Sequence, residues 1–349
     1  MRILVTGHTG FKGSWLALML ASRGHEVTGL ALDPPAGGLY EKARVAELLA
    51  DDIRLDIREA DATRIAIEST GADLVFHLAA QPLVRRSYGD PRETYETNVN
   101  GTLNVLEGIK ATPQTKASVI ITTDKVYRNV GQKAGYVETD ALGGFDPYSS
   151  SKAMADIMTQ SWMQSFPGTP MAIARAGNVI GGGDVSQDRL LVDIINGFIS
   201  GDSVHIRMPD AVRPWEHVLD CLSGYLAIAD NLLAGGADDA WNISPDPDSF
   251  QTVREIADTA TKWWGGKAGW VDDSGGQHPH EASLLILDPS KIKRELGWRN
   301  LLQFPANLEW TLDWERETRE RAADPRAVAL AQIAQYVNLM PDAKWWSRF

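Results

Sequence analysis

A tyrosine and a lysine stand four residues apart in the segment Tyr148-Ser-Ser-Ser-Lys152. On a helix, this spacing places both side chains on the same face. A nearby ammonium group stabilises tyrosinate and lowers the tyrosine pKa, so that the phenol can serve as a base. Such a pair alone is more often a solvated helix face. Here it follows the polar run Thr122-Thr123-Asp124-Lys125, which comes directly after an apolar segment, and the two motifs together predict a site of proton transfer.

The N-terminal segment carries a second motif, three glycines spaced as T-G-x-x-G-x-x-G where a strand pattern passes into a helical one (residues 6–13). Gly7 permits a tight turn, Gly10 lets backbone amides approach a pyrophosphate, and Gly13 allows close packing of helix and strand. The negative charge of the ligand then lies at the positive N-terminus of the helix. Glycines also mark ordinary turns, but their position at a strand-to-helix junction predicts a dinucleotide-binding loop.

Acidic residues follow the next two predicted strands. Asp33 lies twenty residues past Gly13, where a carboxylate can accept hydrogen bonds from the hydroxyls of an adenosine ribose. The alternative is a loop aspartate ahead of two prolines. Asp56 and Ile57 follow the third strand and are predicted to lie near the adenine edge. Since Asp33 would repel a 2′-phosphate and no arginine directly follows the second strand, we expect NAD rather than NADP.

The elements that must position these residues alternate between apolar runs and amphipathic stretches, which is typical of a parallel sheet with crossover helices. The expected strands are 2–5, 26–31, 74–78, 119–122 and 171–174, and the expected helices are 11–23, 218–233 and 252–264. After Gly181-Gly182-Gly183 short strands and helices mix. We therefore predict an α/β fold: a Rossmann-like doubly wound parallel sheet over residues 1–180, and a smaller C-terminal α/β substrate lobe over residues 181–349, with crossing of the chain between them allowed.

The composition narrows the class of protein. The 349-residue chain has a net charge of −12, which argues against a nucleic-acid partner because such binding needs a positive field. Cys221 is the single cysteine, so neither a disulfide framework nor a cysteine-rich metal site is expected. His278 and His280 lack a third ligand at metal-binding spacing, and we expect no metal. The sequence begins in a strand pattern and has no apolar run long enough to span a bilayer, so we expect a cytoplasmic protein without a membrane partner.

Together the motifs resemble those of the extended short-chain dehydrogenase/reductases, the NAD-dependent epimerase/dehydratase family, and within it the CDP-glucose 4,6-dehydratases. The similar stretches span nearly the whole chain: TGHTGFKGSWL (6–16), ALDPP (31–35), FHLAAQPLVR (76–85), TNVNGT (97–102), DPYSSSK (146–152), RAGNVIGGGD (175–184), RPWEHVLD (213–220) and HPHEA (278–282). A lysine directly after Asp124 marks the cytidine-linked group, whereas enzymes for thymidine-linked glucose carry glutamate there. The resemblance implies an NAD-dependent lyase that converts a nucleotide hexose, here CDP-D-glucose, into the 4-keto-6-deoxyhexose and water.

The resemblance also gives a role to each residue of the catalytic group. Tyr148, helped by Thr123, would take the proton of the sugar 4-hydroxyl, while Lys152 positions the nicotinamide ribose and hydride passes from C4 to NAD. The resulting ketone acidifies H5, which Lys125 would remove as a base, and Asp124 would protonate the departing 6-hydroxyl. Hydride then returns to C6, so the cofactor is recycled. Lys125 can act in this way only if burial or a neighbouring cation lowers its pKa toward neutrality.

The surroundings of cofactor and substrate follow from the same resemblance. NAD would be held by the glycine loop, the strand ends and the catalytic pair: Gly7, Thr9, Gly10, Phe11, Gly13, Asp33, Asp56, Ile57, Leu78, Ala79, Ala80, Asn98, Thr122, Tyr148 and Lys152. The nucleotide sugar would be held by Gln81, Asn178, Arg189, Arg213 and His280. The two arginines would grip the diphosphate through bidentate hydrogen bonds. A homodimer formed through helices near 98–110 and 148–165 is the implied assembly.

Two stretches depart from the family. Between Tyr127 and Tyr136 the chain reads RNVGQKAG, where the family usually has a tryptophan-containing loop. After residues 278–282 it reads SLLILD, without the aromatic and basic residues often found there. Both stretches lie where sugar and base would be recognised, so the dehydratase chemistry is better supported than the identity of the nucleotide or hexose.

Two alternatives stay open at this point. A 4-epimerase of the same fold would need Tyr148 and Lys152 but would have no use for an acid and a base at positions 124 and 125. A catalytically silent dinucleotide-binding protein would need neither pair, and the intact catalytic residues argue against it.

Overall fold

The computed structural model describes residues 1–275, 285–340 and 343–349. Its centre is a seven-stranded sheet in the order β11-β6-β5-β4-β1-β2-β3, in which each neighbouring pair is parallel. The strands are β1 (Arg2–Thr6), β2 (Glu26–Ala31), β3 (Asp51–Arg54), β4 (Leu74–His77), β5 (Ala117–Ile121), β6 (Met171–Ala176) and β11 (Asp239–Ile243). The predicted doubly wound parallel sheet is confirmed.

The strand order reverses at β1, since β2 and β3 extend the sheet on one side and β4, β5 and β6 extend it on the other. A reversal of this kind opens a crevice at the carboxyl ends of the strands. Strands β4, β5 and β6 are buried along their whole length, because helices cover both faces of the sheet. The segments that follow β1, β4 and β5 therefore meet at the crevice.

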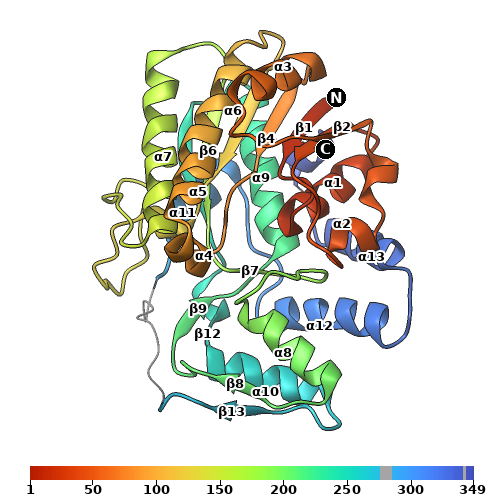
Figure 1. The fold of residues 1–349 in the computed structure, drawn as a ribbon. Helices are drawn as coiled ribbons and strands as arrows, with labels where there is room; N and C mark the ends of the chain where they lie inside the picture. Colours follow the sequence, from red (N-terminus) through yellow and green to blue (C-terminus); the bar gives the residue numbers. More distant parts are fainter. Residues whose placement is uncertain (276–284, 341–342) are drawn as a thin grey trace.

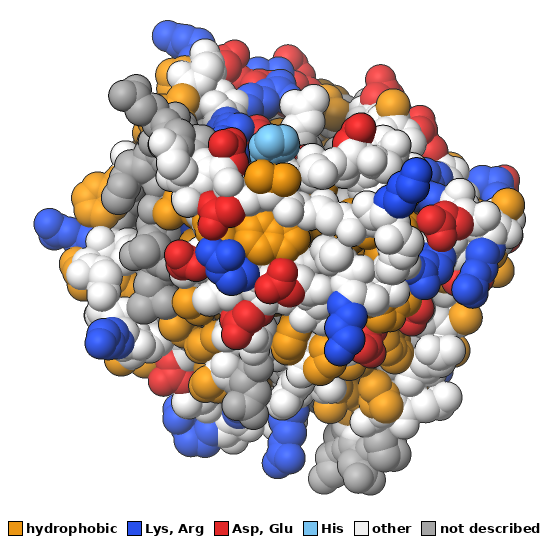
Figure 2. Space-filling model, turned by 90° about the horizontal axis from the view of Figure 1, so that it is seen from below, with side chains coloured by type: hydrophobic (Ala, Val, Ile, Leu, Met, Phe, Trp, Pro, Cys, Tyr) orange, Lys and Arg blue, Asp and Glu red, His pale blue; other side chains and the backbone are white. Residues whose placement is uncertain are grey.

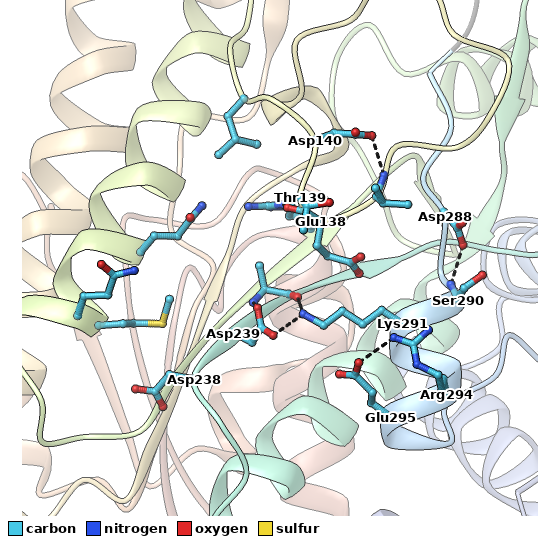
Figure 3. Close-up of a pocket in the computed structure, with 17 residues that line it drawn as sticks. Glu138, Thr139, Asp140, Asp238, Asp239, Asp288, Ser290, Lys291, Arg294 and Glu295 are labelled. Carbon is cyan, nitrogen blue, oxygen red and sulfur yellow. Dashed lines mark hydrogen bonds and ion pairs between the residues drawn. The ribbon is translucent and has the colours of Figure 1, made fainter.

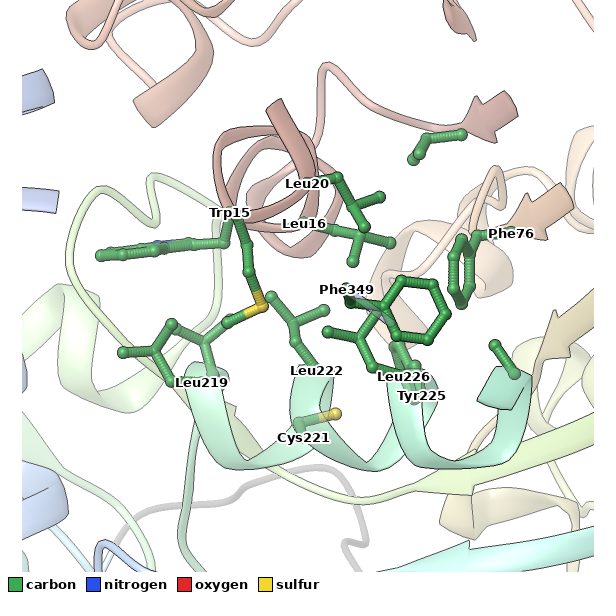
Figure 4. Packing of buried hydrophobic residues seen from close by; sticks show 14 of the residues in the cluster. Trp15, Leu16, Leu20, Phe76, Leu219, Cys221, Leu222, Tyr225, Leu226 and Phe349 are labelled. Atoms are coloured by element: carbon green, nitrogen blue, oxygen red, sulfur yellow. The ribbon is translucent and has the colours of Figure 1, made fainter. Parts of the chain in front are cut away.

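Helices cover the two faces of the sheet in separate groups (Figure 1). One face carries α3 (Ala60–Thr70), α6 (Gly101–Lys110) and α7 (Pro147–Ser165), and the other carries α1 (Phe11–Ser22), α9 (Val218–Leu233) and α13 (Pro325–Asn338). Figure 4 shows how α1 packs against α9, where Trp15 and Leu16 meet Leu219 and Leu222, all fully buried. Full burial of one such side chain contributes about 1.5–3 kcal/mol. This packing anchors the helix that follows the glycine loop.

A smaller lobe lies below the sheet in Figure 1 and has its own apolar core. It contains α8 (Leu190–Ser200), α10 (Val253–Trp264) and α12 (Ala306–Arg319), with the strand pairs β7 (Val179–Ile180) and β10 (Glu216–His217), β8 (Val204–Ile206) and β13 (Trp270–Asp272), and β9 (Val212–Pro214) and β12 (Phe250–Thr252). The segment beyond residue 180 also returns α9 and β11 to the larger lobe. The chain thus crosses between the lobes.

The remaining elements are short. They are α2 (Leu39–Lys42), α4 (Val84–Gly89), α5 (Pro91–Tyr95), a π-helical turn (Glu96–Asn100), α11 (Ser290–Leu296), and 3-10 turns at Val45–Leu48, Asp124–Val126, Pro247–Ser249 and Lys344–Ser347. The predicted bounds of β2 and α9 are confirmed. Helix α10 begins at Val253 because Thr252 caps it: the Thr252 hydroxyl accepts from the Glu255 amide, and the Glu255 carboxylate accepts from the Thr252 amide.

Figure 2 views the molecule from below. Over the described residues of this face, acidic and basic side chains are interspersed, with hydrophobic side chains between them. Throughout the described ranges, no helix has both the length and the apolar character that a membrane crossing requires. No set of three His, Cys, Asp or Glu side chains in those ranges is arranged to hold a metal ion.

Candidate active site

The loop after β1 brings the start of α1 so close to the end of β4 that side chains do not fit. Gly7 has φ of 75°, in the left-handed region that favours glycine, and a Cβ there would lie 2.6 Å from the Ala79 nitrogen. A Cβ at Gly13 would lie 2.2 Å from the Gly7 carbonyl oxygen. Gly10 caps α1 without a side-chain hydrogen bond, which leaves the first-turn amides for an anion. This cradle fits the diphosphate of a dinucleotide.

The glycine loop is tied to its neighbours at the rim of the crevice. The Thr9 hydroxyl donates to the Leu32 carbonyl at 3.0 Å, which fixes the loop to the end of β2. Thr9 and Phe11 line a small hollow with Leu39 and with residues 183–186 of the segment beyond β7. The larger lobe and the segment that leads into the smaller lobe therefore border the same hollow.

Asp33 projects into solvent beyond β2, with 92% of its side chain exposed. Its Oδ1 lies 3.8 Å from Nε of Arg54, the last residue of β3. Arg54 is held there because its Nη2 donates to Asp52 at 2.8 Å and to the Tyr40 hydroxyl at 3.0 Å. Sequence reasoning missed this arginine, although the pairing of Ala31 with Arg54 between β2 and β3 places it beside the acid. A carboxylate and a fixed cation thus stand together where an adenosine ribose would lie.

NAD should bind more tightly than NADP, because Asp33 accepts from a 2′-hydroxyl and repels a 2′-phosphate. In Asp33→Asn the repulsion is gone and Arg54 faces the phosphate, so the preference for NAD should fall by about tenfold or more, as expected for one charge-assisted hydrogen bond. Calorimetric titration of the apo-protein with both cofactors measures this ratio. The control is Asp33→Asn/Arg54→Gln, in which the gain toward NADP should disappear. Tighter NADP binding by the parent chain would overturn the assignment.

Tyr148 and Lys152 lie at the start of α7. Asp146 caps this helix by accepting from the Ser149 amide at 2.9 Å, which sets where the helix begins. Lys152 Nζ donates to the Ile121 carbonyl at 2.8 Å, so its ammonium is fixed at the end of β5. Both side chains are buried. The predicted pair is therefore held against the carboxyl edge of the sheet.

Burial decides the proton affinity of both groups. It raises the pKa of Tyr148 to about 12, and a hydrogen bond with Thr123 and the charge of Arg189 oppose the rise. This direction is opposite to the one expected from the tyrosine–lysine spacing, because desolvation of tyrosinate outweighs the nearby cations. Burial, followed by the charge of Lys12, lowers the pKa of Lys152 to about 8. The tyrosine therefore holds its proton until cations or hydrogen bonds stabilise its anion.

Asp124 and Lys125 form a turn directly after the end of β5. The Asp124 side chain is buried, and its Oδ1 accepts from the Thr123 hydroxyl at 2.8 Å. Lys125 Nζ lies 3.5 Å from the same Oδ1 and its side chain is one-third exposed, at 33%. An acid and an amine thus stand in contact, with the amine on the open side.

The segment that contains Asn178 passes close to this acid. A Cβ at Gly177 would lie 3.4 Å from Asp124 Oδ2 and 3.7 Å from the Pro214 ring. The Asn178 carbonyl accepts from the Glu216 amide at 3.1 Å, which joins β7 to β10. Arg213, next to Pro214, is half-buried in β9. Two predicted substrate residues, Asn178 and Arg213, therefore directly adjoin residues that lie close to one another, and Gly177 also lies close to Asp124.

A buried ion pair joins β6 to α7 next to the candidate catalytic residues. Arg175 on β6 makes two hydrogen bonds to Asp156 on α7, at 2.7 and 2.8 Å. Asp156 also accepts from the Thr122 hydroxyl at 3.0 Å, and Arg175 donates to the Tyr127 hydroxyl at 2.8 Å. Both members of the pair are almost fully buried. This network, which sequence reasoning missed, locks the end of β5 and the turn after it to helix α7.

Comparison with known proteins identifies the family of this chain. The sequence model of the NAD dependent epimerase/dehydratase family matches residues 3–244. The chain belongs to this family. The resemblance drawn from the motifs is thereby confirmed.

Individual relatives of this epimerase/dehydratase chain cover nearly its full length. It is 44% identical over 348 residues to the CDP-glucose 4,6-dehydratase of Salmonella typhimurium, covering 97% of this chain and 96% of that protein. A probable dTDP-glucose 4,6-dehydratase of Sinorhizobium fredii is 29% identical, over 91% of this chain and 93% of its own.

Solved structures show the same fold. A dTDP-glucose 4,6-dehydratase from Streptomyces venezuelae, crystallised with NAD, superposes with a TM-score of 0.76 at 27% identity, over 92% of this chain and 98% of that one. A UDP-glucose-4-epimerase from Stenotrophomonas maltophila, with bound NAD, gives a TM-score of 0.80 at 20% identity, over 93% and 100% of the two chains. The second likeness concerns the fold alone.

Several residues predicted to bind ligands are engaged within the chain. The Gln81 side chain donates to Thr94 at 2.8 Å and accepts from the Leu83 amide at 2.6 Å. Asn98 accepts from the Gln81 amide at 2.8 Å and donates to Ser151 at 2.9 Å. Both amides therefore brace the segment after β4 against α7. Their contact with ligand stays a prediction, as does that of Leu78 and Ala80 in the same segment.

The adenine side carries a second local pair. Asp56 Oδ2 accepts from Arg58 Nη2 at 2.6 Å, and this bond is the main reason why the pKa of Asp56 is lowered. Ile57 is buried, and its side chain fills the space that a Cβ at Gly101 would need. Both residues follow β3 as predicted, and their contact with adenine stays a prediction. His280 lies outside the described residues.

A cavity of about 890 Å³ (Figure 3) has a lining that includes none of the candidate catalytic residues. It is bordered by residues 137–142, the end of α7, the start of β11 and α11. Two of its cations pair with carboxylates, Lys291 with Asp239 at 2.5 Å and Arg294 with Glu295 at 2.9 Å. Arg175 reaches it, but its guanidinium is already bound to Asp156. The cavity therefore borders the supporting network and is no part of the site.

Proposed function

We propose that this chain is an NAD-dependent nucleotide-sugar 4,6-dehydratase, a hydro-lyase whose substrate is CDP-D-glucose and whose products are CDP-4-keto-6-deoxy-D-glucose and water. The observation that carries the proposal is the contact between Asp124 and Lys125 beside the Tyr148–Lys152 pair. The 44% identity to a CDP-glucose 4,6-dehydratase over 97% of the chain supports the choice of nucleotide.

The cofactor would lie along the crevice. The glycine cradle would hold its diphosphate, Asp33 its adenosine ribose and Lys152 its nicotinamide ribose. Bound NAD would accept a hydride from C4 of the sugar and return it to C6. The fit rests on the cradle, in which a Cβ at Gly7 or Gly13 would clash, and on the exposed carboxylate of Asp33.

Tyr148 would remove the proton of the sugar 4-hydroxyl as the hydride leaves C4. Its high pKa makes a neutral phenol the resting form, so the oxygen needs help to serve as a base. The Thr123 hydroxyl and the Arg189 guanidinium both act to lower that pKa. Lys152 adds a fixed ammonium on the same helix face.

Asp124 and Lys125 would carry out the elimination. Once C4 is a ketone, the amine of Lys125 would take the proton at C5 and the acid of Asp124 would protonate the departing 6-hydroxyl. The 3.5 Å between Nζ and Oδ1 places the amine and the acid where both could reach adjacent carbons of one sugar. A substrate covering this corner would exclude water from the elimination.

Two other functions fit less well. A 4-epimerase would use Tyr148 and Lys152 but leaves the contact between Asp124 and Lys125 without a role. A silent dinucleotide-binding protein leaves both pairs without a role.

The substrate assignment is tested with a panel of nucleotide hexoses. CDP-glucose should give a 4-keto product faster than the thymidine, uridine and guanosine analogues do. Asn178, Arg189 and Arg213 would hold its diphosphate, and the departures at residues 128–135 and 283–288 lie where sugar and base would be read. Faster turnover of another nucleotide hexose would replace the cytidine assignment, and the absence of a 4-keto product from every member would refute the dehydratase.

We also propose that the chain forms a homodimer through α6 and α7. Helix α7 exposes Met154 and Ile157, 47% and 52% accessible and one turn apart, which offers an apolar surface to a second copy of the helix. Ile157→Glu should halve the mass measured by analytical ultracentrifugation, because a charge cannot be buried there unpaired. Ile65→Glu, at a 56% exposed position on α3, is the matched control and should leave the mass unchanged. A parent chain that sediments as a monomer would refute the dimer.

We also propose that the protein is cytoplasmic. The buried thiol of Cys221, which forms no disulfide, is compatible with a reducing compartment.

A further inference from the structure

The loop that enters α8 turns at a residue in the left-handed backbone region. Asp188 has φ of 59°, a conformation that few residues with a Cβ adopt and that aspartate and asparagine tolerate best. It directly precedes Arg189, the capping residue of α8, whose carbonyl accepts from the Asp193 amide at 3.0 Å. The contacts of Asp188 therefore bear on how Arg189 enters the helix.

Asp188 is held by a residue from the other lobe. Its Oδ1 accepts from Nη1 of Arg85 at 2.5 Å, and Arg85 lies in the first turn of α4. Helix α4 packs against α7, the helix that carries Tyr148 and Lys152. The bond thus ties the loop before α8 to the body that holds the catalytic pair.

This ion pair is too exposed to serve as a stabilising element. Each side chain is 41% accessible, and exposed pairs of this kind contribute little to stability because water screens them. The pair instead fixes the path of the backbone. Because Arg85 holds Asp188 in a left-handed conformation, it determines the direction in which the chain continues to Arg189.

The surroundings of the pair bring Arg189 near Tyr148. Burial is the main cause of the raised pKa of Tyr148, and the charge of Arg189 is one of the smaller influences that oppose it, so Arg189 lies close enough to act on the phenol. Burial, followed by the charge of Asp188, raises the pKa of Asp193 in the first turn of α8, and Arg85 opposes that rise. Because Asp188 is bound to Arg85 and α4 packs against α7, the pair stands between α8 and the helix that carries Tyr148.

We propose that Arg85 and Asp188 form a latch across the mouth of the active-site crevice, which positions Arg189 to bind the diphosphate of the nucleotide sugar. Arg85 and Asp188 are positioning residues that act through Arg189 and take no part in proton or hydride transfer. The inference rests on the proposed function, since it assumes a substrate that carries a diphosphate. The inference adds to the proposed function two residues that set the affinity for substrate without contacting the cofactor.

The test compares Asp188→Asn, Arg85→Gln, the double variant and Arg85→Lys. Asparagine tolerates the left-handed conformation as aspartate does, so Asp188→Asn removes the ion pair and keeps the backbone. Each single variant should raise KM for CDP-glucose by about tenfold, the size of one lost charge-assisted contact, with kcat changed by less than about twofold. The double variant should be no worse than either single one, because both remove the same contact. Arg85→Lys should restore most of the affinity, and the Kd for NAD should stay the same in all four.

Three results would overturn the latch: an unchanged KM in both single variants, multiplied effects in the double variant, or a parallel loss of NAD affinity. A measurement of CDP binding to the NAD-loaded chain separates this proposal from the function it rests on. If no nucleotide hexose is turned over but the variants weaken CDP binding by the same factor, the latch stands and the dehydratase falls. If CDP-glucose is turned over and the variants leave KM unchanged, the latch alone falls.

Discussion

Tyr148→Phe is expected to slow oxidation at C4 by about 10²–10⁴-fold, the usual contribution of a positioned general base, and to lower product formation by the same factor. Without the phenolic oxygen, the 4-hydroxyl cannot lose its proton as the hydride leaves. Phenylalanine keeps the buried ring, so the fold should be retained. Rapid mixing with CDP-glucose, followed by the absorbance of reduced nicotinamide and by assay of the 4-keto product, measures both steps.

Tyr88→Phe is the matched control, because Tyr88 is 67% exposed on α4 and its hydroxyl has no role in the proposed reaction. That variant should behave as the parent does. If Tyr148→Phe retained parental rates of nicotinamide reduction, another group would have to be the base and the assignment of the catalytic pair would be wrong.

The fold was largely predictable because its signals are local. Runs such as residues 74–76 are apolar throughout, as is typical of strands buried on both faces. The start of α10 follows from the capping pair of Thr252 and Glu255. Gly7 marks a turn that needs a positive φ. What local pattern could not give was the return of residues 239–243 to the sheet as its seventh strand, since that depends on packing across the whole chain.

The candidate site was predictable where its members are close in sequence. Tyr148 and Lys152 share a helix face, and Asp124 follows a strand by a fixed spacing. The position of Arg54 could not be predicted in this way, because it lies near Asp33 only as a result of the register between β2 and β3.

Other parts of the site depend equally on the three-dimensional packing. The pair of Asp156 and Arg175 and the pair of Arg85 and Asp188 join segments far apart in sequence, and no spacing rule connects them. The raised pKa of Tyr148 depends on burial, which a sequence motif does not report.

A 4,6-dehydratase needs an acid for the departing 6-hydroxyl, whereas a 4-epimerase or a silent dinucleotide-binding protein does not. Hydroxide is a poor leaving group, and general-acid help is typically worth about 10²–10⁴ in rate. Asp124→Asn removes the transferable proton and keeps the size of the side chain and its contact with the Thr123 hydroxyl. Oxidation at C4 should be spared, because Tyr148 and Lys152 are untouched. Asp61→Asn, on the exposed side of α3, is the control for loss of a carboxylate without loss of the acid.

The most direct test of the dehydratase mechanism is therefore a single turnover of CDP-glucose by NAD-loaded Asp124→Asn, with reduced nicotinamide and 4-keto-6-deoxy product followed together. Reduced nicotinamide should form at nearly the parental rate and accumulate, while the product should be released about 10²–10⁴-fold more slowly. Release of product at the parental rate, with no accumulation of reduced nicotinamide, would contradict the role of Asp124 and with it the assignment as a 4,6-dehydratase.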